Sequence, residues 1–309
     1  MSDSIPISVV MPVYNNARYL PAALDSILNQ TFTNFRFLIV DDGSTDESLA
    51  ILQAYAAKDA RIQLIERSHP RENWGIARSL NQLLALADSE FIARMDADDI
   101  CLADRFARQI AFLQQHPDVV CVGCCLDWID EKGRFVGHCP MPEQDEEIQA
   151  LLVGGISMLH HPCTLFRREP VMQIGGYNES MMASSDLDLW LRLGEVGKLA
   201  NLPETLFLYR LHAQSITNSK QARQIYDAHE ACKRAWQRRG IQAAFIRKPA
   251  NHLKQYDFWL RCGWHGFVDG QRSLARRCGL QAIALRPTAL EAWKLLACAL
   301  IKPLPTAMS

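Results

Sequence analysis

The chain has 309 residues, of which 49% are hydrophobic, so a sizeable core can form without disulfide or metal staples. The net charge of −1 hides an uneven distribution, because residues 233–302 carry 14 basic and 3 acidic side chains and leave the remainder at −12. No apolar run approaches the roughly 20 residues of a membrane-spanning helix, and no basic and apolar leader follows Met1. We therefore expect a cytoplasmic protein that carries no secretion signal.

The ten cysteines do not form a recognisable metal pattern. The nearest approach is Cys121-Val-Gly-Cys124-Cys125, and no second pair follows it at the spacing of a zinc finger. We expect free thiols that pack as small apolar groups in a reducing compartment.

Short apolar runs alternate with helical patterns along the first 115 residues. Strands are expected at residues 7–11, 35–40, 63–65 and 90–95, and helices at 18–28, 46–57, 76–86 and 104–115. This alternation predicts an α/β protein with a Rossmann-like, mostly parallel sheet and helices on both faces. Ligands of such sheets bind beyond the carboxyl ends of the strands.

The second half of the chain divides into a mixed region and a helical region. Short strands, turns and helices are expected between 119 and 209, and helices predominate after 218. We expect a first domain at 1–218, with a donor half of about 1–100 and an acceptor half of about 101–218. Residues 219–309 would form a basic helical appendage, in which 270–303 resemble one pair of packed helices.

Polar residues follow the first two expected strands. Pro12-Val13-Tyr14-Asn15 follows the first strand, and Asp41-Asp42-Gly43-Ser44-Thr45-Asp46-Glu47 follows the second. Ser44 and Glu47 have the spacing of a helix capping box, which gives residues 43–47 a structural role. Capping does not explain two adjacent carboxylates at the end of a strand, since like charges there need a donor or a cation. We therefore assign Asp42 a role in ligand binding.

Asp96-Ala97-Asp98-Asp99 follows the strand expected at 90–95. Residues two apart in an extended chain point to the same side, so Asp96 and Asp98 would present two carboxylates together. Mg²⁺ and Mn²⁺ prefer such oxygen ligands, and a diphosphate leaving group needs a cation of this kind. An acidic loop that caps the following helix is the simpler alternative.

The usual glycine-rich phosphate loops are missing from the sequence. It contains neither a Walker A motif nor Gly-Xaa-Gly-Xaa-Xaa-Gly. A metal ion and side chains would therefore hold the phosphates.

These motifs together resemble the family 2 glycosyltransferases, which have the A-type glycosyltransferase fold. The resemblance extends through Asn73-Trp74-Gly75-Ile76-Ala77-Arg78-Ser79-Leu80-Asn81, His161-Pro162, Gly175-Gly176-Tyr177, Ser185-Asp186-Leu187-Asp188-Leu189-Trp190 and Tyr209-Arg210-Leu211-His212, in the family's order. It covers about residues 7–215. It implies an inverting transfer of a sugar from a nucleotide-diphosphate-sugar, with a UDP-sugar as the expected donor, to a hydroxyl group.

The resemblance also implies roles for individual side chains. Asp186 would be the general base, and Asp98 and His212 would bind Mn²⁺ or Mg²⁺. The nucleotide-sugar would contact Pro12, Tyr14, Asn15, Asp42, Arg78 and Asp96, with Tyr14 and Asp42 at the base and Asp96 at the ribose or the metal. His161, Gly176 and Trp190 would lie on the acceptor side. Each of Tyr14, Asp186 and His212 has a plain structural alternative, as a turn aromatic, a helix cap and a core histidine respectively.

One departure from the family pattern concerns the residue before the base. The family commonly has Glu-Asp where this chain has Ser185-Asp186. The base is kept and its acidic neighbour is lost, which puts the hydrogen bonding of the acceptor in doubt. A sugar-nucleotidyltransferase and a non-catalytic scaffold with a degenerate site remain as alternatives.

The expected partners follow from the resemblance and from the charge distribution. The resemblance implies a nucleotide-sugar donor and a glycan or lipid-linked acceptor, and we expect no nucleic acid. The basic residues after 218 lie near Trp259, Trp264, Phe267 and Trp293, a mixture that suits an anionic membrane surface. We expect peripheral attachment at the inner face of the membrane, with a solvated arginine-rich helix face as the alternative.

Overall fold

The structure, a computed structural model, describes residues 6–65, 73–212, 221–242, 255–268 and 270–301. The chain divides into two compact units. The first contains residues 1–126 and 140–247, and the second contains residues 127–139 and 248–309. The boundary expected at 218/219 lies outside the described residues, and the two-part division by function stays a prediction.

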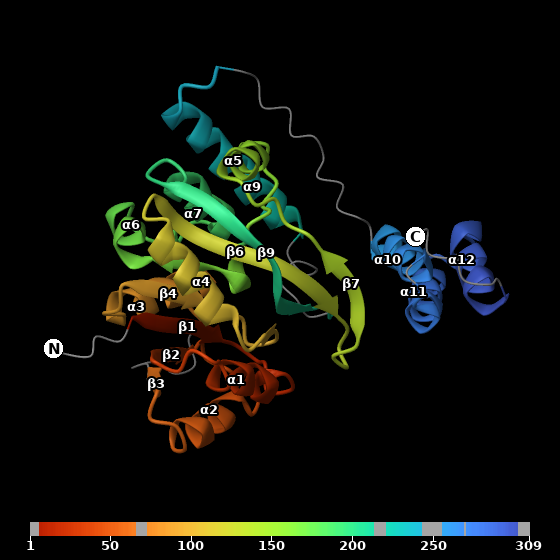
Figure 1. Cartoon of the computed structure of the whole chain (residues 1–309), viewed down its shortest axis with the longest axis horizontal. Coiled ribbons are helices and arrows are strands. Elements are labelled where there is room, and N and C mark those ends of the chain that lie inside the picture. The colour runs from red at the N-terminus through yellow and green to blue at the C-terminus, as the bar shows by residue number, and fades with distance from the viewer. Residues whose placement is uncertain (1–5, 66–72, 213–220, 243–254, 269, 302–309) are drawn as a thin grey trace. The chain divides into compact units, whose positions relative to one another are not determined.

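A nine-stranded sheet runs through the described residues in the order β3-β2-β1-β4-β8-β6-β9-β5, with β7 paired to β6 (Figure 1). The strands are β1 (Ile7–Val13), β2 (Phe35–Asp41), β3 (Ile62–Ile65), β4 (Phe91–Arg94), β5 (Ile100–Cys101), β6 (Val119–Ile129), β7 (Phe135–Cys139), β8 (Leu165–Arg167) and β9 (Lys198–Arg210).

The sheet changes character at β4. The β3–β2–β1–β4 part is parallel, as the alternation of strands and helices predicts. The pairs β4–β8, β6–β8 and β5–β9 are antiparallel. Pro12 fits inside β1 because the pairing with β4 ends at Val10, so its missing N–H interrupts no bond to that neighbour.

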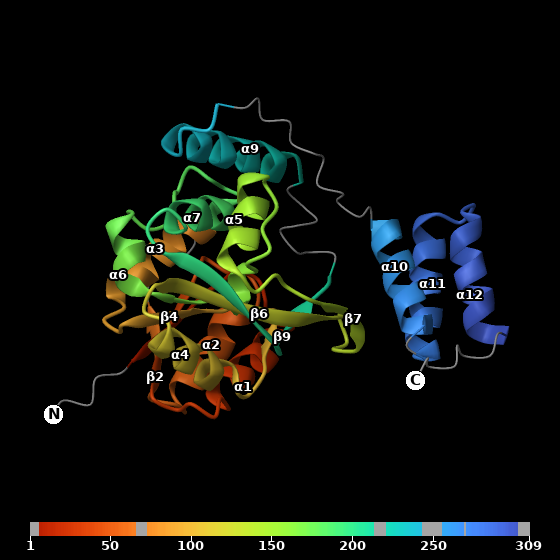
Figure 2. The same cartoon turned by 45° about the horizontal axis from the view of Figure 1, so that its top comes forward.

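Helices cover both faces of the sheet. One face packs against α3 (Ile76–Leu86), α5 (Asp145–Val153), α6 (Arg168–Gln173), α7 (Ser185–Leu193) and α9 (Gln221–Arg238). In Figure 2 these helices lie above the sheet, and α1 (Leu20–Leu28), α2 (Ser48–Ala56) and α4 (Arg105–Gln115) lie below it. The arrangement confirms the α/β fold class of the sequence prediction.

The amphipathic spacing explains why α3 forms where it does. Ala77, Leu80, Leu83 and Leu84 recur at helical spacing and are all buried against the sheet. Gly75 precedes the helix with a φ of 82°, a conformation that favours glycine. The α3 bounds agree with the sequence prediction because the apolar stripe and the glycine mark both its face and its start.

The capping-box interpretation of residues 44–47 is wrong. The helix α2 begins at Ser48, and its N-cap residue Glu47 makes no side-chain cap hydrogen bond. Ser44 instead accepts a hydrogen bond from the backbone N–H of Asn15 at 3.0 Å. A contact with the neighbouring strand end outweighs the local capping pattern.

Helix α9 packs on the first unit through small and apolar residues. The core of the first unit includes four residues of this helix, Ala228, Ala231, Cys232 and Ala235. Trp236 also donates a hydrogen bond from Nε1 to the carbonyl of Val153 at 3.1 Å. This helix begins the region that the sequence predicts to be a helical appendage.

The second unit combines the end of the β6–β7 hairpin with three helices, α10 (Gln255–Val268), α11 (Arg272–Leu285) and α12 (Leu290–Ile301). Phe267, Ala275 and Leu295 form a small core there, and Arg277 donates a hydrogen bond to the carbonyl of Phe135. The helices α11 and α12 correspond to the packed pair expected at 270–303.

Two further expectations concern cysteines and membrane spans. All ten cysteines are free and buried, as predicted. Among the described residues, none of the helices has the length and apolar character needed to cross a bilayer.

Candidate active site at the carboxyl edge of the parallel strands

The loops that follow β1 and β2 are joined by hydrogen bonds. The side chain of Asn15 accepts a hydrogen bond from the backbone N–H of Thr45 at 2.7 Å, and its own N–H donates to Ser44. Asn15 has a φ of 51°, in the left-handed region that asparagine tolerates better than most residues. Tyr14 is 45% exposed beside this junction. The arrangement fixes the loop backbone and leaves the tyrosine ring open to a ligand.

Asp42 connects β2 to the start of α3. Its two carboxylate oxygens accept hydrogen bonds from the backbone N–H groups of Trp74 and Gly75, at 2.8 and 3.0 Å. Each carboxylate oxygen can accept more than one hydrogen bond, so a ligand donor can still be accommodated. The guanidinium of Arg78 lies 3.9 Å from the centre of the Trp74 ring. Asp42, Trp74 and Arg78 therefore form one wall of the site.

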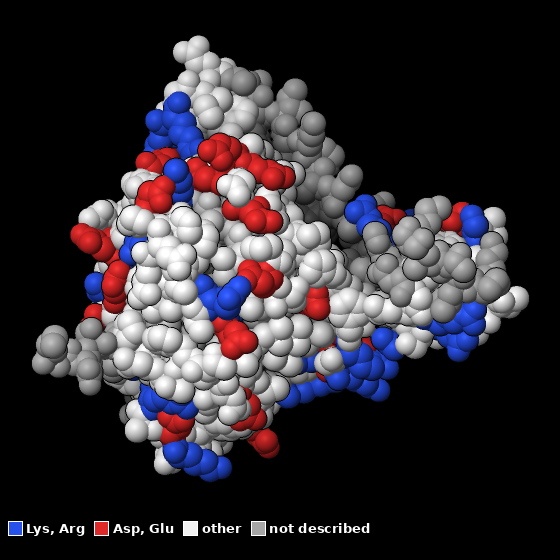
Figure 3. All heavy atoms as spheres, in the orientation of Figure 1, with Lys and Arg blue, Asp and Glu red and all other residues white. Residues whose placement is uncertain are grey.

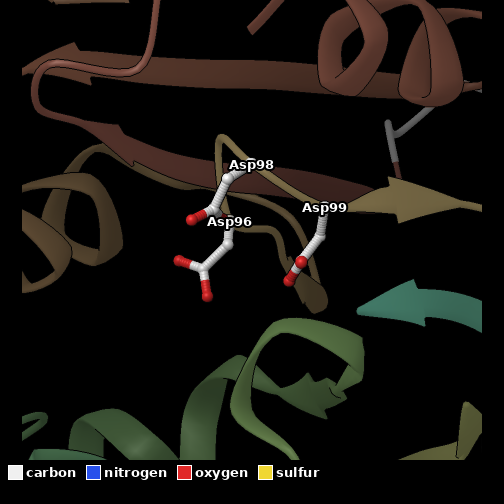
Figure 4. A group of neighbouring side chains, drawn as sticks. All are labelled: Asp96, Asp98 and Asp99. Carbon is white, nitrogen blue, oxygen red and sulfur yellow. The ribbon is translucent and has the colours of Figure 1, made fainter. Parts of the chain in front are cut away.

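Three carboxylates gather at the end of β4. Asp96, Asp98 and Asp99 each offer an oxygen within 4.8 Å of the others, and Figure 4 shows Asp96 and Asp98 close together with Asp99 nearer to β5. The Nε2 atom of His212 lies 2.8 Å from Oδ2 of Asp98. The structure thus brings together two residues that are 114 positions apart in the sequence.

Asp99 is the buried member of the group. Its Oδ1 accepts a hydrogen bond from the backbone N–H of Arg210 at 2.7 Å, and Oδ2 has no hydrogen-bond partner among the described residues. Burial, together with the charges of Asp98 and Asp96, raises the pKa of Asp99 well above its usual value. Arg210 also donates from Nε to the carbonyl of Asp98, so the end of β9 fixes the backbone of residues 98–99.

Arg94 and Asp96 form an ion pair at the end of β4. The guanidinium is fully buried, and the carboxylate is partly exposed. Removal from water raises the pKa of Asp96, the charge of Arg94 opposes that effect, and the charges of Asp98 and Asp186 add to it. The influence of Asp186 on Asp96 indicates that Asp186 lies within electrostatic range of the acidic loop formed by residues 96–99.

Asp186 lies in the first turn of α7, which begins at Ser185. Burial raises the pKa of Asp186, while the N–H groups of Leu187 and Asp186 donate to its carboxylate and lower it. The N-cap residue of α7 is Ser184, so Asp186 lies inside the helix and is not its cap. Trp190 follows four residues later on the same face of the helix and is fully buried.

His161 lies next to Trp190 and Tyr177. Its Nε2 lies 2.7 Å from the hydroxyl of Tyr177, and its ring centre is 5.8 Å from that of Trp190. Burial lowers the pKa of His161 well below its usual value, so the ring is neutral. The ring of the neighbouring His160 lies 6.0 Å from that of Tyr209, so the two adjacent histidines contact different aromatic partners.

Gly176 is held by Asn81 of α3. The Asn81 side chain accepts a hydrogen bond from the N–H of Tyr177 at 2.8 Å and donates to its carbonyl at 2.9 Å. A Cβ atom on Gly176 would lie 2.7 Å from Oδ1 of Asn81. The glycine therefore has a packing role in this structure.

The family model for glycosyl transferase family 2 matches residues 8–175. The chain belongs to glycosyl transferase family 2. Two curated relatives are similar to this chain over most of their length. The amylovoran biosynthesis glycosyltransferase AmsE of Erwinia amylovora is 30% identical over 69% of this chain and 79% of the relative. The O-antigen biosynthesis glycosyltransferase WbnJ of Escherichia coli is 31% identical over 70% of this chain and 84% of the relative.

Solved structures of glycosyltransferases share the fold at lower identity. Residues 1–349 of TarS from S. aureus, in complex with UDP-GlcNAc, match with a TM-score of 0.59 and 18% identity, over 95% of this chain and 89% of that one. The mannosyltransferase PcManGT of Pyrobaculum calidifontis, in complex with GDP-Man and Mn²⁺, matches with a TM-score of 0.59 and 20% identity, over 98% and 82%. This family 2 member is an enzyme of the glycosyltransferase type and has the A-type fold.

The acidic loop of this family 2 glycosyltransferase fits a hard divalent cation. The carboxylates of Asp96 and Asp98 are oxygen donors of the kind that Mn²⁺ and Mg²⁺ prefer, and His212 adds an imidazole nitrogen next to Asp98. The orphaned Oδ2 of Asp99 is a further buried acceptor beside them.

Sequence reasoning missed four residues of the site, namely Arg94, Asn81, Tyr177 and Arg210. A charged residue inside the apolar run Phe91-Ile-Ala-Arg94-Met95 is a signal that could have identified Arg94. Asn81, Tyr177 and Arg210 stand within the quoted motifs, but their partners come from distant segments, so only the structure assigns their contacts.

Proposed function

We propose that the protein transfers a sugar from a nucleotide-diphosphate-sugar, with UDP as the preferred nucleotide, to a hydroxyl group with inversion at the anomeric centre. The observation that carries this proposal is the pairing of His212 with Asp98 beside Asp96 at the carboxyl edge of the parallel strands, with the charge of Asp186 within electrostatic reach of Asp96. A cation-binding pair and a separate carboxylate are the groups that direct displacement of a nucleoside diphosphate requires.

The donor would lie along the carboxyl edge. Tyr14 and Asp42 would contact the base, supported by Pro12, Asn15 and Arg78, and Asp96 would contact the ribose. Proteins of this fold that bind UDP-GlcNAc, and GDP-Man with Mn²⁺, support a nucleotide-sugar as the donor class. A divalent cation bound by Asp98 and His212 would offset the negative charge that develops on the diphosphate.

The acceptor would approach from the side of α7. Asp186 would take the proton from the attacking hydroxyl, and its raised pKa brings it closer to the operating pH than an ordinary aspartate. Trp190 and the neutral His161 would shape the surface beneath the acceptor, and the glycine turn at Gly176 would hold Tyr177 in place. Curated relatives named for amylovoran and O-antigen biosynthesis support a glycan or lipid-linked acceptor.

We further propose that the second unit attaches the enzyme to the inner face of a membrane. Arg261 on α10, Arg276 on α11 and Arg286 just after α11 are exposed, and Leu290 and Trp293 are 82% and 50% exposed at the start of α12. Figure 3 shows basic side chains gathered along the lower edge of this unit. Exposed aromatic and apolar groups beside arginines suit an anionic lipid interface.

The proposed function is tested by a thermal-shift screen of UDP, GDP, CDP and dTDP, each with Mn²⁺, Mg²⁺ or EDTA. A ligand at 100 times its Kd stabilises the folded state by about 2.7 kcal/mol, so binding raises the Tm measurably. We expect UDP to raise the Tm of the wild type only with a metal ion, and to have no effect on Asp98→Ala. A shift that persists in EDTA would argue against the metal role, and no shift with any nucleotide would favour the non-catalytic scaffold.

A further inference from the structure

Arg94 ends β4 with a guanidinium that is completely withdrawn from solvent. Within the described ranges its ion-pair partner is Asp96, two residues further along the chain. Apart from that pair, the guanidinium nitrogens have no hydrogen-bond partner in the part of the chain that the structure describes. Burial of a cation with unfilled donors is unfavourable for folding, so stability alone does not explain an arginine at this position.

The surroundings of Arg94 are strongly negative. The carboxylates of Asp98 and Asp99 each offer an oxygen within 4.8 Å of one on Asp96, so like charges crowd Asp96 and the charge of Arg94 opposes their repulsion. The same guanidinium acts favourably on the ionised forms of Asp99 and Asp186. Arg94 is therefore a buried cation paired with one member of a close-set group of carboxylates at the end of β4.

Arg105 shows what a buried arginine with a purely structural role looks like in this fold. It is also fully buried, but its Nε donates to Oε1 of Gln109 at 3.0 Å. Its Nη2 donates to the carbonyls of Arg94 and Thr164 at 2.8 and 2.9 Å. Arg105 satisfies its donors with uncharged scaffold groups, whereas the partner of Arg94 is a side chain of the candidate site.

We propose that Arg94 is a positioning residue that holds the carboxylate of Asp96 in the orientation that binds the donor, against repulsion from the neighbouring carboxylates of Asp98 and Asp99. The proposal rests on the proposed function, since it takes Asp96 to contact the nucleotide-sugar. Arg94 would act on the donor through Asp96 and not by direct contact, because its side chain is shielded from solvent. The planar guanidinium suits this task because it can orient a carboxylate with more than one N–H group.

A double-mutant cycle on nucleotide affinity tests the proposal. The wild type, Arg94→Met, Asp96→Asn and the Arg94→Met/Asp96→Asn double variant would be titrated with UDP and Mn²⁺ in a calorimeter. We expect each single substitution to raise the Kd about tenfold or more, and the double variant to bind no more weakly than Asp96→Asn alone. Arg94→Lys should recover part of the affinity, since it restores the charge without the planar fork.

Arg167→Met is the matched control. Arg167 pairs with Phe91 at the opposite end of the β4–β8 ladder, and its guanidinium donates to the carbonyls of Val119 and Leu113. Loss of this arginine should lower the Tm and leave the Kd for UDP unchanged. If Arg94→Met does not fold, the double variant removes both charges at once and its Kd is compared directly with that of Asp96→Asn.

The outcomes separate this proposal from the proposed function. If the wild type binds UDP with Mn²⁺ and Arg94→Met binds equally well, the positioning role is overturned and the function stands. A double variant that loses a further tenfold relative to Asp96→Asn also overturns it, because Arg94 would then act independently of Asp96. A wild type that binds no nucleotide overturns the function and this inference with it.

Discussion

The aspartates of the candidate site lie in different environments. Asp42 accepts hydrogen bonds from two backbone N–H groups, and Asp96 forms an ion pair with a buried guanidinium. One carboxylate oxygen of Asp99 has no hydrogen-bond partner among the described residues, and Asp186 lies in the first turn of a helix. Desolvation and neighbouring charges decide how readily each carboxylate ionises, so chemically identical side chains can bind a nucleotide, hold a metal ion or accept a proton. The assignment of Asp186 as base depends on such a difference.

The base assignment predicts a specific kinetic defect. Replacement of Asp186 by asparagine keeps the size of the side chain and removes its ability to take a proton. We expect kcat to fall about 10²- to 10⁴-fold, with the Kd for UDP and Mn²⁺ unchanged. Steady-state transfer assays and calorimetry measure the two quantities.

The matched control for this prediction lies on the same helix. Asp188 is buried, and its carboxylate pairs with Arg192 at 2.7 Å. Asp188→Asn should lower the Tm and leave the kcat of the folded protein close to that of the wild type. Turnover that survives in Asp186→Asn would refute the assignment.

At the scale of elements, contacts between strand-end loops decide the local geometry. Ser44 contacts Asn15 and does not cap α2, and Asp42 joins β2 to the start of α3. For Ser44, a contact with the distant residue Asn15 replaces the local capping partner that the sequence suggests. The same principle applies to Asn81, which links α3 to the glycine turn that precedes α7.

This link predicts unequal effects for two neighbouring glycines. Gly176 has a φ of 67° and faces Asn81, whereas Gly175 has a φ of 84° and no atom within 4 Å of an added Cβ. Gly175→Ala should lower the free energy of unfolding by only about 1 kcal/mol, because alanine is strained at a positive φ but meets no neighbouring atom. Gly176→Ala should lose a further 1–3 kcal/mol or so, because the new methyl group displaces Asn81.

Urea denaturation of both alanine variants measures the difference in unfolding free energy. Equal losses for the two glycines would show that Asn81 is not a rigid clamp. A selective rise in the KM for the acceptor in Gly176→Ala, with donor affinity unchanged, would support a position near the acceptor.

At the scale of the whole molecule, the charge of the chain is divided between regions with different roles. The C-terminal region is strongly basic, while the acidic side chains that define the site belong to the first unit. Part of the basic charge on α9 is neutralised inside the first unit, where Arg238 and Arg239 pair with Glu195. The exposed arginines of the second unit are therefore the ones that a membrane surface would contact.

Membrane attachment predicts a charge-dependent association with vesicles. Replacement of Arg261, Arg276 and Arg286 by glutamine should weaken binding to anionic vesicles about 100-fold, at roughly 1 kcal/mol for each arginine near the surface. A control variant with Lys58, Arg108 and Lys198 replaced by glutamine removes the same number of charges from the first unit and should bind normally. The proposal would be contradicted if both variants pelleted with anionic vesicles to the same extent as the wild type in a co-sedimentation assay.

The sequence alone determined the α/β alternation, the core of the first helices and strands, and the motifs that identify the family. These features depend on hydrophobic periodicity and on short runs of residues, both of which are local properties of the chain. The tertiary structure decided the antiparallel pairing beyond β4, the pairing of Arg94 with Asp96, the approach of His212 to Asp98, and the packing of α9 on the first unit. These features join residues that are adjacent in space and mostly distant in sequence, and the free energies of desolvation and ion pairing that govern them depend on the packed surroundings.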